Sequence, residues 1–388
     1  YYAFIRQIGA GAVAAGGIIT LIKTIPTISK SIRSSMASLK NTGNATDTAL
    51  RTEKDLSLKV VGWGSLALVA LISLLPQIPG EGIAQRLLIG LLVVLFGALF
   101  VTVSSRIVGL IGSSNNPISG MTIATVMGTS LIFLSVGWTG QSFEPLVLVV
   151  GGMICIAAAN AGATSQDLKS GYIVGATPRN QQIALFVGAI VSSVVIGLTV
   201  KFLDKPSMQL MQQGVTHAIG TEKYPAPQAT LMATLIKGIL SQNLDWQYVF
   251  TGMFLAIVME LCGIKALSFA VGAYLPLSTT LPIFIGGAIR GLVEWNTAKK
   301  EKGVQPQQEE ELSKGSLFAT GLVAGGAVAG VLIAFIAGTS GGEQFLSRIS
   351  LEETLVHGLG NNGYYLLGLI GFALMALILY RNASAKEN

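Results

Sequence analysis

The chain has 388 residues, of which 51% are hydrophobic and 11% are charged, and its net charge is +6. A soluble domain carries about 25% charged residues, so this composition excludes an ordinary soluble protein and indicates a chain built within a bilayer. The two cysteines, Cys155 and Cys262, lie in separate apolar segments, which predicts small packed residues and not a disulfide or a metal pair.

Long charge-free windows predict the membrane spans in chain order. Crossing a bilayer takes roughly 20 mostly apolar residues, and windows of about that length recur along the whole chain. We expect about 10–11 transmembrane helices, counting broken or re-entrant segments. We place them near residues 7–28, 59–76, 87–105, 119–138, 145–163, 183–202, 226–241, 248–270, 281–296, 315–338 and 364–381.

Charged loops predict the orientation of these spans. Segment 29–58 is polar and basic, and segment 297–314 carries several lysines, so both are expected to be cytoplasmic loops. Segment 339–363 is acidic and is expected outside. These assignments agree only if the short segment 226–241 crosses the membrane, which is why it is kept. Because basic loops account for the net charge, we do not expect nucleic acid as a partner.

The first unusual feature is SSNNPISGMT, residues 113–122, inside a charge-free stretch. Pro117 removes a backbone donor and pushes Asn116 out of helical geometry. Ser119 is a good N-cap for the span that follows. The pattern therefore predicts a break in the helix at membrane depth and a new helix starting near Ser119.

Glu260 lies next along the chain, in the apolar run FLAIVMELCGIKAL. An ionisable residue within a span is costly and is a candidate functional residue by default. A lone buried carboxylate would take up and release protons, so Glu260 is our candidate for proton coupling. The alternative is a carboxylate near the helix end that is paired with a neighbouring helix.

A second break is predicted at YLPLSTTLP, residues 274–282, where Pro276-Leu277-Ser278 matches the types of Pro117-Ile118-Ser119. A pair of Pro-interrupted spans is typical of a transporter binding site with inverted-repeat character. The restarted helices would aim their N-termini at an anionic part of the substrate. We expect 115–119 and 274–279 to face one polar cavity near the midplane, with two ordinary surface loops as the alternative.

Signatures of enzymes are absent from the sequence. It contains no HExxH, no Gly-rich loop that ends in GK[ST], and no GxSxG. The two histidines, His217 and His357, have no carboxylate or cysteine at metal-ligand spacing. We therefore expect no catalytic residues, no metal site, no cofactor and no enzyme activity.

Four stretches resemble the oligopeptide transporter family, in particular its bacterial members near the yellow stripe-like branch. They are IGAGAVAAGGIITLIKTIPTI at 8–28, SNNPISGMT at 114–122, NAGATSQDLKSGYIVGATPRNQQIAL at 160–185 and GAYLPLSTTLPIFIGGAIRGLVE at 272–294. The resemblance covers the later part of the family only. It implies a proton-coupled symporter that imports oligopeptides or metal chelates without ATP.

The resemblance also bears on the site, because QDLK-x-GY is a signature of the family. The alternative to a substrate-path role for this motif is a surface charge pair between Asp167 and Lys169. Asn160 lies earlier in the same span, and its amide can offer both a donor and an acceptor. The candidate substrate-binding residues are Asn115, Asn116, Ser119, Asn160, Gln166, Asp167, Tyr274, Ser278 and Thr279.

Together these observations predict an all-α polytopic membrane protein, with residues 1–388 forming one transmembrane transporter domain in the cell inner membrane. The expected function is proton-coupled import of small oligopeptides or peptide-like metal chelates. Its partners would be that substrate, protons and membrane lipid. Glycine-rich helix faces permit a homo-oligomer and equally serve internal packing. The alternative function is a channel or passive pore for a small polar solute, with the Pro breaks as its filter.

Overall fold

A computed structural model describes residues 4–42, 50–78, 80, 82–112, 116–206, 211, 214–221, 226–241, 246–275, 277–300, 314–337 and 341–384. Most of these residues are in α-helices, and six helices are long and apolar enough to cross a membrane. Four shorter apolar stretches of helix accompany them, at Gln7–Thr20, Lys59–Leu74, Gln228–Leu240 and Trp246–Leu261. The protein is therefore an all-α polytopic membrane protein, as the sequence predicts.

Every expected span coincides with helical structure. The helices are α1 (Ile5–Thr42), α2 (Leu58–Leu74), α3 (Ile83–Ile111), α4 (Ile118–Val136), α5 (Glu144–Ile173), α6 (Pro178–Leu203), α8 (Pro227–Ser241), α9 (Trp246–Leu261), α10 (Ala266–Tyr274), α11 (Leu277–Lys300), α12 (Lys314–Ala337), α13 (Gly342–Ile349) and α14 (Glu352–Ala383).

Four of the segments expected between spans are partly helical. Segment 29–58 begins as a continuation of α1 to Thr42, because no glycine or proline interrupts the polar run before Gly43. Likewise α5 continues through the QDLKSGY motif to Ile173, and the chain turns only at Gly175, whose φ is 75°. The acidic segment 339–363 contains α13 and the start of α14. Of segment 297–314, the first residues extend α11, and 301–313 lie outside the described residues.

The expected span 248–270 is wrong as a single helix, because the chain breaks into α9 and α10 after Leu261. The Gly263 N–H bonds to the Glu260 carbonyl at 3.1 Å and the Ile264 N–H bonds to the Met259 carbonyl at 2.9 Å. This pair of bonds is a Schellman ending, which requires a left-handed residue, and Gly263 supplies it with φ 86°. The break places Glu260 at a helix end.

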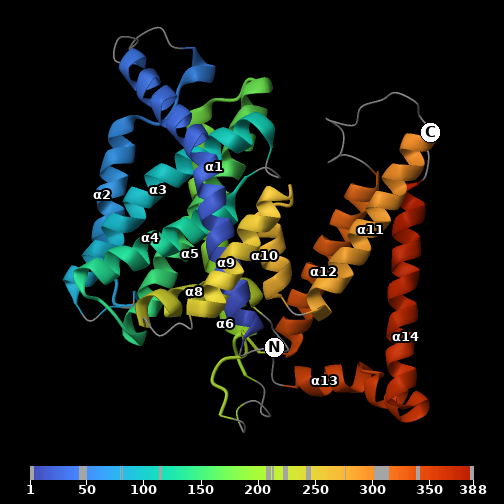
Figure 1. Ribbon diagram of the computed structural model, residues 1–388. Coiled ribbons are helices and arrows are strands. Elements are labelled where there is room, and N and C mark those ends of the chain that lie inside the picture. The colour runs from blue at the N-terminus through green and yellow to red at the C-terminus, as the bar shows by residue number, and fades with distance from the viewer. Residues whose placement is uncertain are drawn as a thin grey trace. The chain divides into compact units, whose positions relative to one another are not determined.

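Residues 1–192 and 226–275 form a first compact unit. Within it α1 packs along α9 and α10, while α3 and α4 pack against α5 (Figure 1). Two clusters of buried aliphatic and aromatic side chains fill the unit, one centred on α3, α4 and α5 and the other on α1, α9 and α10.

Glycines allow the closest helix crossings in this unit. A Cβ on Gly11 of α1 would overlap the backbone carbonyl of Val249, and a Cβ on Gly252 of α9 would overlap the carbonyl of Ile8. Gly17 faces Ile123 of α4 in the same way. These glycines therefore serve helix packing, since small residues let helix backbones approach closely.

Residues 193–225 and 276–388 form a second compact unit. In it α12 packs against α13 and α14, and α11 packs against α14. The Asn296 amide donates to the Tyr380 hydroxyl at 3.0 Å, and Phe202 lies 5.4 Å from Phe335 between ring centroids. A Cβ on the glycine stripe of α12 would meet no described atom within 4 Å apart from its own chain neighbours and nearby helix backbone; the stripe comprises Gly321, Gly325, Gly326 and Gly330.

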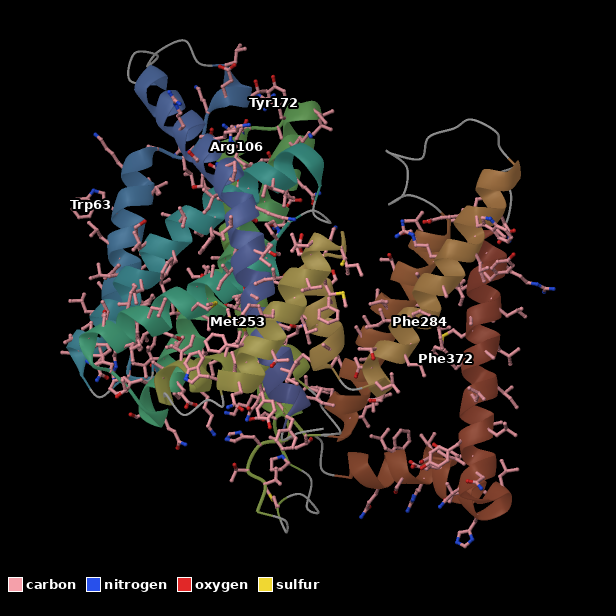
Figure 2. All side chains as sticks on the ribbon, in the orientation of Figure 1. Trp63, Arg106, Tyr172, Met253, Phe284 and Phe372 are labelled. Atoms are coloured by element: carbon pink, nitrogen blue, oxygen red, sulfur yellow. The ribbon has the colours of Figure 1, made fainter. Side chains whose placement is uncertain are left out.

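Apolar side chains cover the outer faces of several helices. Figure 2 shows Trp63 of α2 on the outer side of the first unit, where 73% of its surface is exposed. Ile190, Val194 and Leu198 on α6 are exposed as well. Aliphatic surface of this extent matches the hydrocarbon of a membrane, in which the backbone of a helix satisfies its own polar groups.

Candidate functional site

The break between α3 and α4 is the expected interruption at Pro117. Helix α3 ends at Ile111 and is followed by Gly112, whose φ of 94° is positive, and α4 starts at Ile118. The Ile118 N–H bonds to the Asn116 carbonyl at 2.9 Å. The predicted cap is wrong, since Pro117 occupies the N-cap position and Ser119 lies exposed within the first turn of α4. Asn115 lies outside the described residues.

A hydrogen-bond network fastens this break to two spans. Asn116 donates from Nδ2 to Ser104 Oγ on α3 at 2.8 Å. Ser104, which is fully buried, donates in turn to the Ala158 carbonyl on α5. Gly162, one turn further along α5, leaves room for the amide, because a Cβ there would lie 3.1 Å from Asn116 Nδ2 and 3.3 Å from Ser104 Oγ. We call Ser104, Asn116, Ala158 and Gly162 the break anchor.

One polar atom in the break anchor has no hydrogen-bond partner among the described residues. It is Asn116 Oδ1, which is covered by protein although the residue as a whole is partly exposed. A buried acceptor without a donor costs about 1–3 kcal/mol. The atom is therefore a place where a donor from a ligand or a water molecule would be stabilised.

Further polar contacts join α3 and α5 toward their C-terminal ends. Ser105 and Ser165 lie 2.7 Å apart between hydroxyl oxygens, and Ser165 also donates to the Ser105 carbonyl at 2.9 Å. The Lys169 ammonium donates to the Gly109 carbonyl at 3.0 Å, near the negative end of α3. Arg106 and Tyr172 lie at this same end of the first unit (Figure 2).

The motif residues of α5 lie apart from the break anchor. Asn160, Gln166 and Asp167 all have exposed side chains on α5. The Asp167 backbone carbonyl accepts from the Gln181 amide at 3.2 Å. Lys169 contacts α3 and not Asp167, so the alternative of a pair between these two neighbours has no support in the described contacts.

The α5–α6 turn is bound to the segment that precedes α2. Arg51 donates to the Gly175 carbonyl at 2.8 Å and to the Thr177 hydroxyl at 3.1 Å. Gln182 accepts from the Leu56 N–H at 2.9 Å and donates to Asp55 at 3.0 Å. The polar run after QDLKSGY therefore has a structural partner at this end of the unit.

Glu260 is not the lone carboxylate that the sequence suggested. It forms an ion pair with Lys23 of α1, and it accepts from the Ala266 N–H at 2.6 Å. Its side chain is 20% exposed and that of Lys23 is 65% exposed. The alternative that was left open, a carboxylate near a helix end paired with a neighbouring helix, is the one observed. Glu260 therefore caps α10 and links it to α1.

The remaining predicted residues belong to the second break. Tyr274 is buried at the end of α10 and packs on Gly9 of α1. Helix α11 starts at Leu277, so a helix restarts directly after proline at both predicted breaks. Ser278 and Thr279 are exposed at the start of α11, in the second unit. That the two breaks face one cavity stays a prediction.

Ser104, Gly162 and Lys23 were not predicted as site residues. The one signal available for Ser104 and Gly162 was that each is a small residue in an apolar span, and small residues let helices approach closely. Lys23 showed no such signal, because its partner is 237 residues away. Among the described residues, no three His, Cys, Asp or Glu side chains are grouped to hold a metal ion.

An exposed acid–imidazole pair lies beyond the end of α6. His217 Nδ1 and Asp204 Oδ2 are 2.6 Å apart, and the Ile219 N–H donates to Asp204 Oδ1 at 3.2 Å. Because an ionised carboxylate only accepts, Nδ1 carries the hydrogen. The hydrogen bond from His217, supported by that from Ile219, holds the pKa of Asp204 below its ordinary value of 3.8.

Comparison with known proteins gives two kinds of match. The family model described as "OPT oligopeptide transporter protein" matches residues 3–337. A protein of Haemophilus influenzae named "Putative oligopeptide transporter" is 30% identical over 391 residues, which cover 90% of this chain and 60% of that protein. An Arabidopsis thaliana protein named as a "Probable metal-nicotianamine transporter" is 28% identical over 179 residues, covering 42% of this chain and 23% of that protein.

The chain therefore spans about 60% of the length of the bacterial relative and less of the plant one. No solved structure matches the chain.

Proposed function

Because the chain belongs to the oligopeptide transporter family, we propose that the intact protein is a proton-coupled secondary transporter. Its substrates are small oligopeptides or peptide-like metal chelates, moved inward across the bacterial inner membrane. The names of the two relatives support this range, since one refers to oligopeptides and the other to a metal chelate.

The observation that carries the proposal is the break anchor. A helix interrupted within an apolar stretch is tolerated where the freed backbone lies in protein or lines a cavity. Here Ser104 holds the interruption and Gly162 leaves room for it, and the covered amide oxygen of Asn116 has no partner in the part of the chain that the structure describes. Such an atom at a broken span supports a substrate site at this place.

The other candidate residues are proposed as further substrate contacts, each within its own unit. Asn160, Gln166 and Asp167 present exposed polar groups along α5 of the first unit. Ser278 and Thr279 present theirs at the second helix restart. We propose that these residues, with Tyr274 and Asn115, contact substrate during transport. A homo-oligomer would use apolar helix faces such as the glycine stripe of α12.

Uptake by the intact protein in proteoliposomes tests the proposal. Labelled di- to hexapeptides and iron chelates are offered with and without an inward proton gradient. We expect one class to accumulate against its own gradient, with saturable kinetics, and a protonophore to abolish accumulation. Flux that rises linearly with concentration and ignores the proton gradient contradicts the proposal and supports a passive pore.

Glu260 is the proposed proton-coupling residue, and its ion pair changes how coupling would work. A proton that arrives at Glu260 would neutralise the carboxylate and release Lys23 of α1, which links protonation to the packing of two helices. Glu260→Gln should retain substrate exchange across the membrane and lose accumulation driven by a proton gradient.

The matched control for this variant is Glu294→Gln, which neutralises an exposed carboxylate paired with Arg290 at 2.6 Å. It should accumulate substrate like the parent. Proton-driven accumulation by Glu260→Gln at the parental level would place the coupling group elsewhere.

A further inference from the structure

The direction of hydrogen bonding in the break anchor is fixed by chemistry. The Ser104 hydroxyl has one hydrogen, and its contact with the Ala158 carbonyl uses that hydrogen, because a carbonyl only accepts. Ser104 Oγ can then only accept from Asn116. The group of Asn116 that faces it at 2.8 Å must be the NH2 and not the carbonyl.

The carbonyl of the Asn116 amide consequently points away from Ser104. Its oxygen has no partner among the described residues. Gly162 leaves room for the amide in this position, since a Cβ there would lie 3.1 Å from Nδ2. The amide cannot exchange its two ends without placing two acceptors, Oδ1 and Ser104 Oγ, against each other.

We propose that Asn116 Oδ1 accepts a hydrogen bond from an N–H group of the substrate, and that Ser104 is the positioning residue that keeps this oxygen available. The inference deepens the proposed transport function and rests on it. The substrate group recognised here is a peptide N–H or an ammonium. A carboxylate is disfavoured, because two acceptors would meet.

This assignment differs from the expectation that the restarted helix binds an anionic part of the substrate. The oxygen is covered in this structure while Asn116 remains partly exposed. The covering atoms therefore have to move before a ligand reaches it. Alternating exposure of a site to the two sides of the membrane requires such movement.

The test compares trialanine with three analogues that each lack one N–H group. Two analogues replace one peptide amide by an ester, which deletes the donor without adding bulk, and the third replaces the terminal ammonium by hydrogen. Each analogue competes with labelled trialanine for uptake into proteoliposomes that contain the intact protein. In the parent, we expect one analogue to compete about tenfold more weakly than trialanine.

Two variants locate the cause of that difference. The quantity compared is the ratio of the inhibition constant of the weakly competing analogue to that of trialanine. Asn116→Ala removes the acceptor, so this ratio should fall to about one. Ser104→Ala leaves the amide free to turn, so the same ratio should fall to about three or less. The ratio is measured on one vesicle preparation, so a loss of folded protein does not change it. Ser73→Ala is the control, since Ser73 is a buried serine whose one hydrogen bond within the described part of the chain goes to the Val69 carbonyl of its own helix.

Each outcome decides something. If Asn116→Ala and Ser104→Ala both transport trialanine and both keep the ratio measured in the parent, this inference is overturned and the transport function stands. If trialanine and all three analogues compete equally in the parent, this inference is also overturned and the transport function stands, because a water molecule or other solvent then satisfies Oδ1. Failure of the parent to transport trialanine and the other peptides overturns the peptide substrate and this inference with it.

Discussion

The Glu260 carboxylate at the end of α9 pairs with the Lys23 ammonium on α1, two residues that are 237 positions apart in the chain. The same carboxylate accepts from the Ala266 N–H at 2.6 Å, at the start of α10. One side chain therefore holds together three helices where α9 breaks. The Gly263 turn makes this geometry available, because it brings the α10 start back to the end of α9.

We predict that Lys23 and Glu260 are energetically coupled. Lys23→Met and Glu260→Gln should each lower the unfolding midpoint of the protein in detergent, and the double variant should lower it by less than the sum of the two. Removing either partner already removes the ion pair, so the second change adds little. The measurement is a double-mutant cycle on thermal unfolding.

A further variant separates the ion pair from the helix cap. Glu260→Ala should lower the midpoint more than Glu260→Gln, because glutamine can still accept from the Ala266 N–H and alanine cannot. Strictly additive effects of Lys23→Met and Glu260→Gln would show that the pair contributes nothing to stability.

Gly252 should tolerate no side chain. A Cβ at this position of α9 would overlap the Ile8 carbonyl and lie 2.8 Å from the Ala12 nitrogen, and backbone cannot move aside as a side chain can. We expect Gly252→Ala to destabilise the protein by about 1–3 kcal/mol, the usual cost of overpacking. Unfolding in denaturant measures the change.

The matched control is Gly152→Ala on α5, where an added Cβ would have no described neighbour within 4 Å. It should be neutral or stabilise the protein by up to about 1 kcal/mol, since alanine favours helix over glycine. Equal effects of Gly252→Ala and Gly152→Ala would mean that the α1–α9 crossing is loose enough to accept a methyl group.

Asn116 and Ser119 should differ in their effect on folding. Asn116→Leu removes the donor to Ser104 Oγ and sets an apolar side chain beside it, so we expect a loss of about 1–3 kcal/mol. Ser119→Ala should change stability by less than about 0.5 kcal/mol, because Ser119 is exposed and forms no cap. Thermal unfolding of both variants checks this. Any effect of Ser119→Ala on uptake that exceeds its effect on stability would support a substrate contact.

Acid should release the turn that Asp204 holds. The pKa of Asp204 is lower in the folded protein than its ordinary value of 3.8, chiefly because His217 donates to the carboxylate. A depressed carboxyl pKa contributes stability that is complete above the unfolded value and is lost as pH falls through the folded value. The turn should therefore stay closed at neutral pH and open only below pH 3.8.

Hydrogen exchange at the Ile219 amide measures this opening, since that N–H donates to Asp204 Oδ1. Asp204→Asn weakens both contacts at every pH. The Ile219 amide should exchange faster in Asp204→Asn than in the parent at neutral pH, and the two exchange rates should become equal in acid. A ratio of the two rates that is independent of pH would contradict the assignment.

The sequence by itself determined the fold class and most of the span positions. Charge-free windows of about twenty residues are a direct consequence of bilayer thickness, so each expected span lies on helical structure, although the span expected at 248–270 is divided into α9 and α10. The two helix restarts at Ile118 and Leu277 also followed from local chemistry, because proline cannot donate to the preceding turn. The family, too, could be identified from motifs of contiguous residues.

The exact helix ends followed less well from the sequence. Ser119 has the right residue type for a cap, yet the Asn116 carbonyl and Pro117 define the start of α4. Gly263 was one glycine among 47 in the chain, and only the backbone around it made it a break. A glycine ends a helix where the chain has somewhere to turn, and that depends on the packing around it.

Only the tertiary structure decided what the polar residues in the spans do. Glu260 looked unpaired because its neighbours in sequence are apolar, whereas its partner Lys23 comes from a helix near the other end of the first unit's sequence. Asn116 was predicted to bind substrate, but its orientation depends on Ser104 and Ala158 from two other helices. Hydrogen bonds and ion pairs depend on distances of about 3 Å, and the packing of distant segments sets those distances.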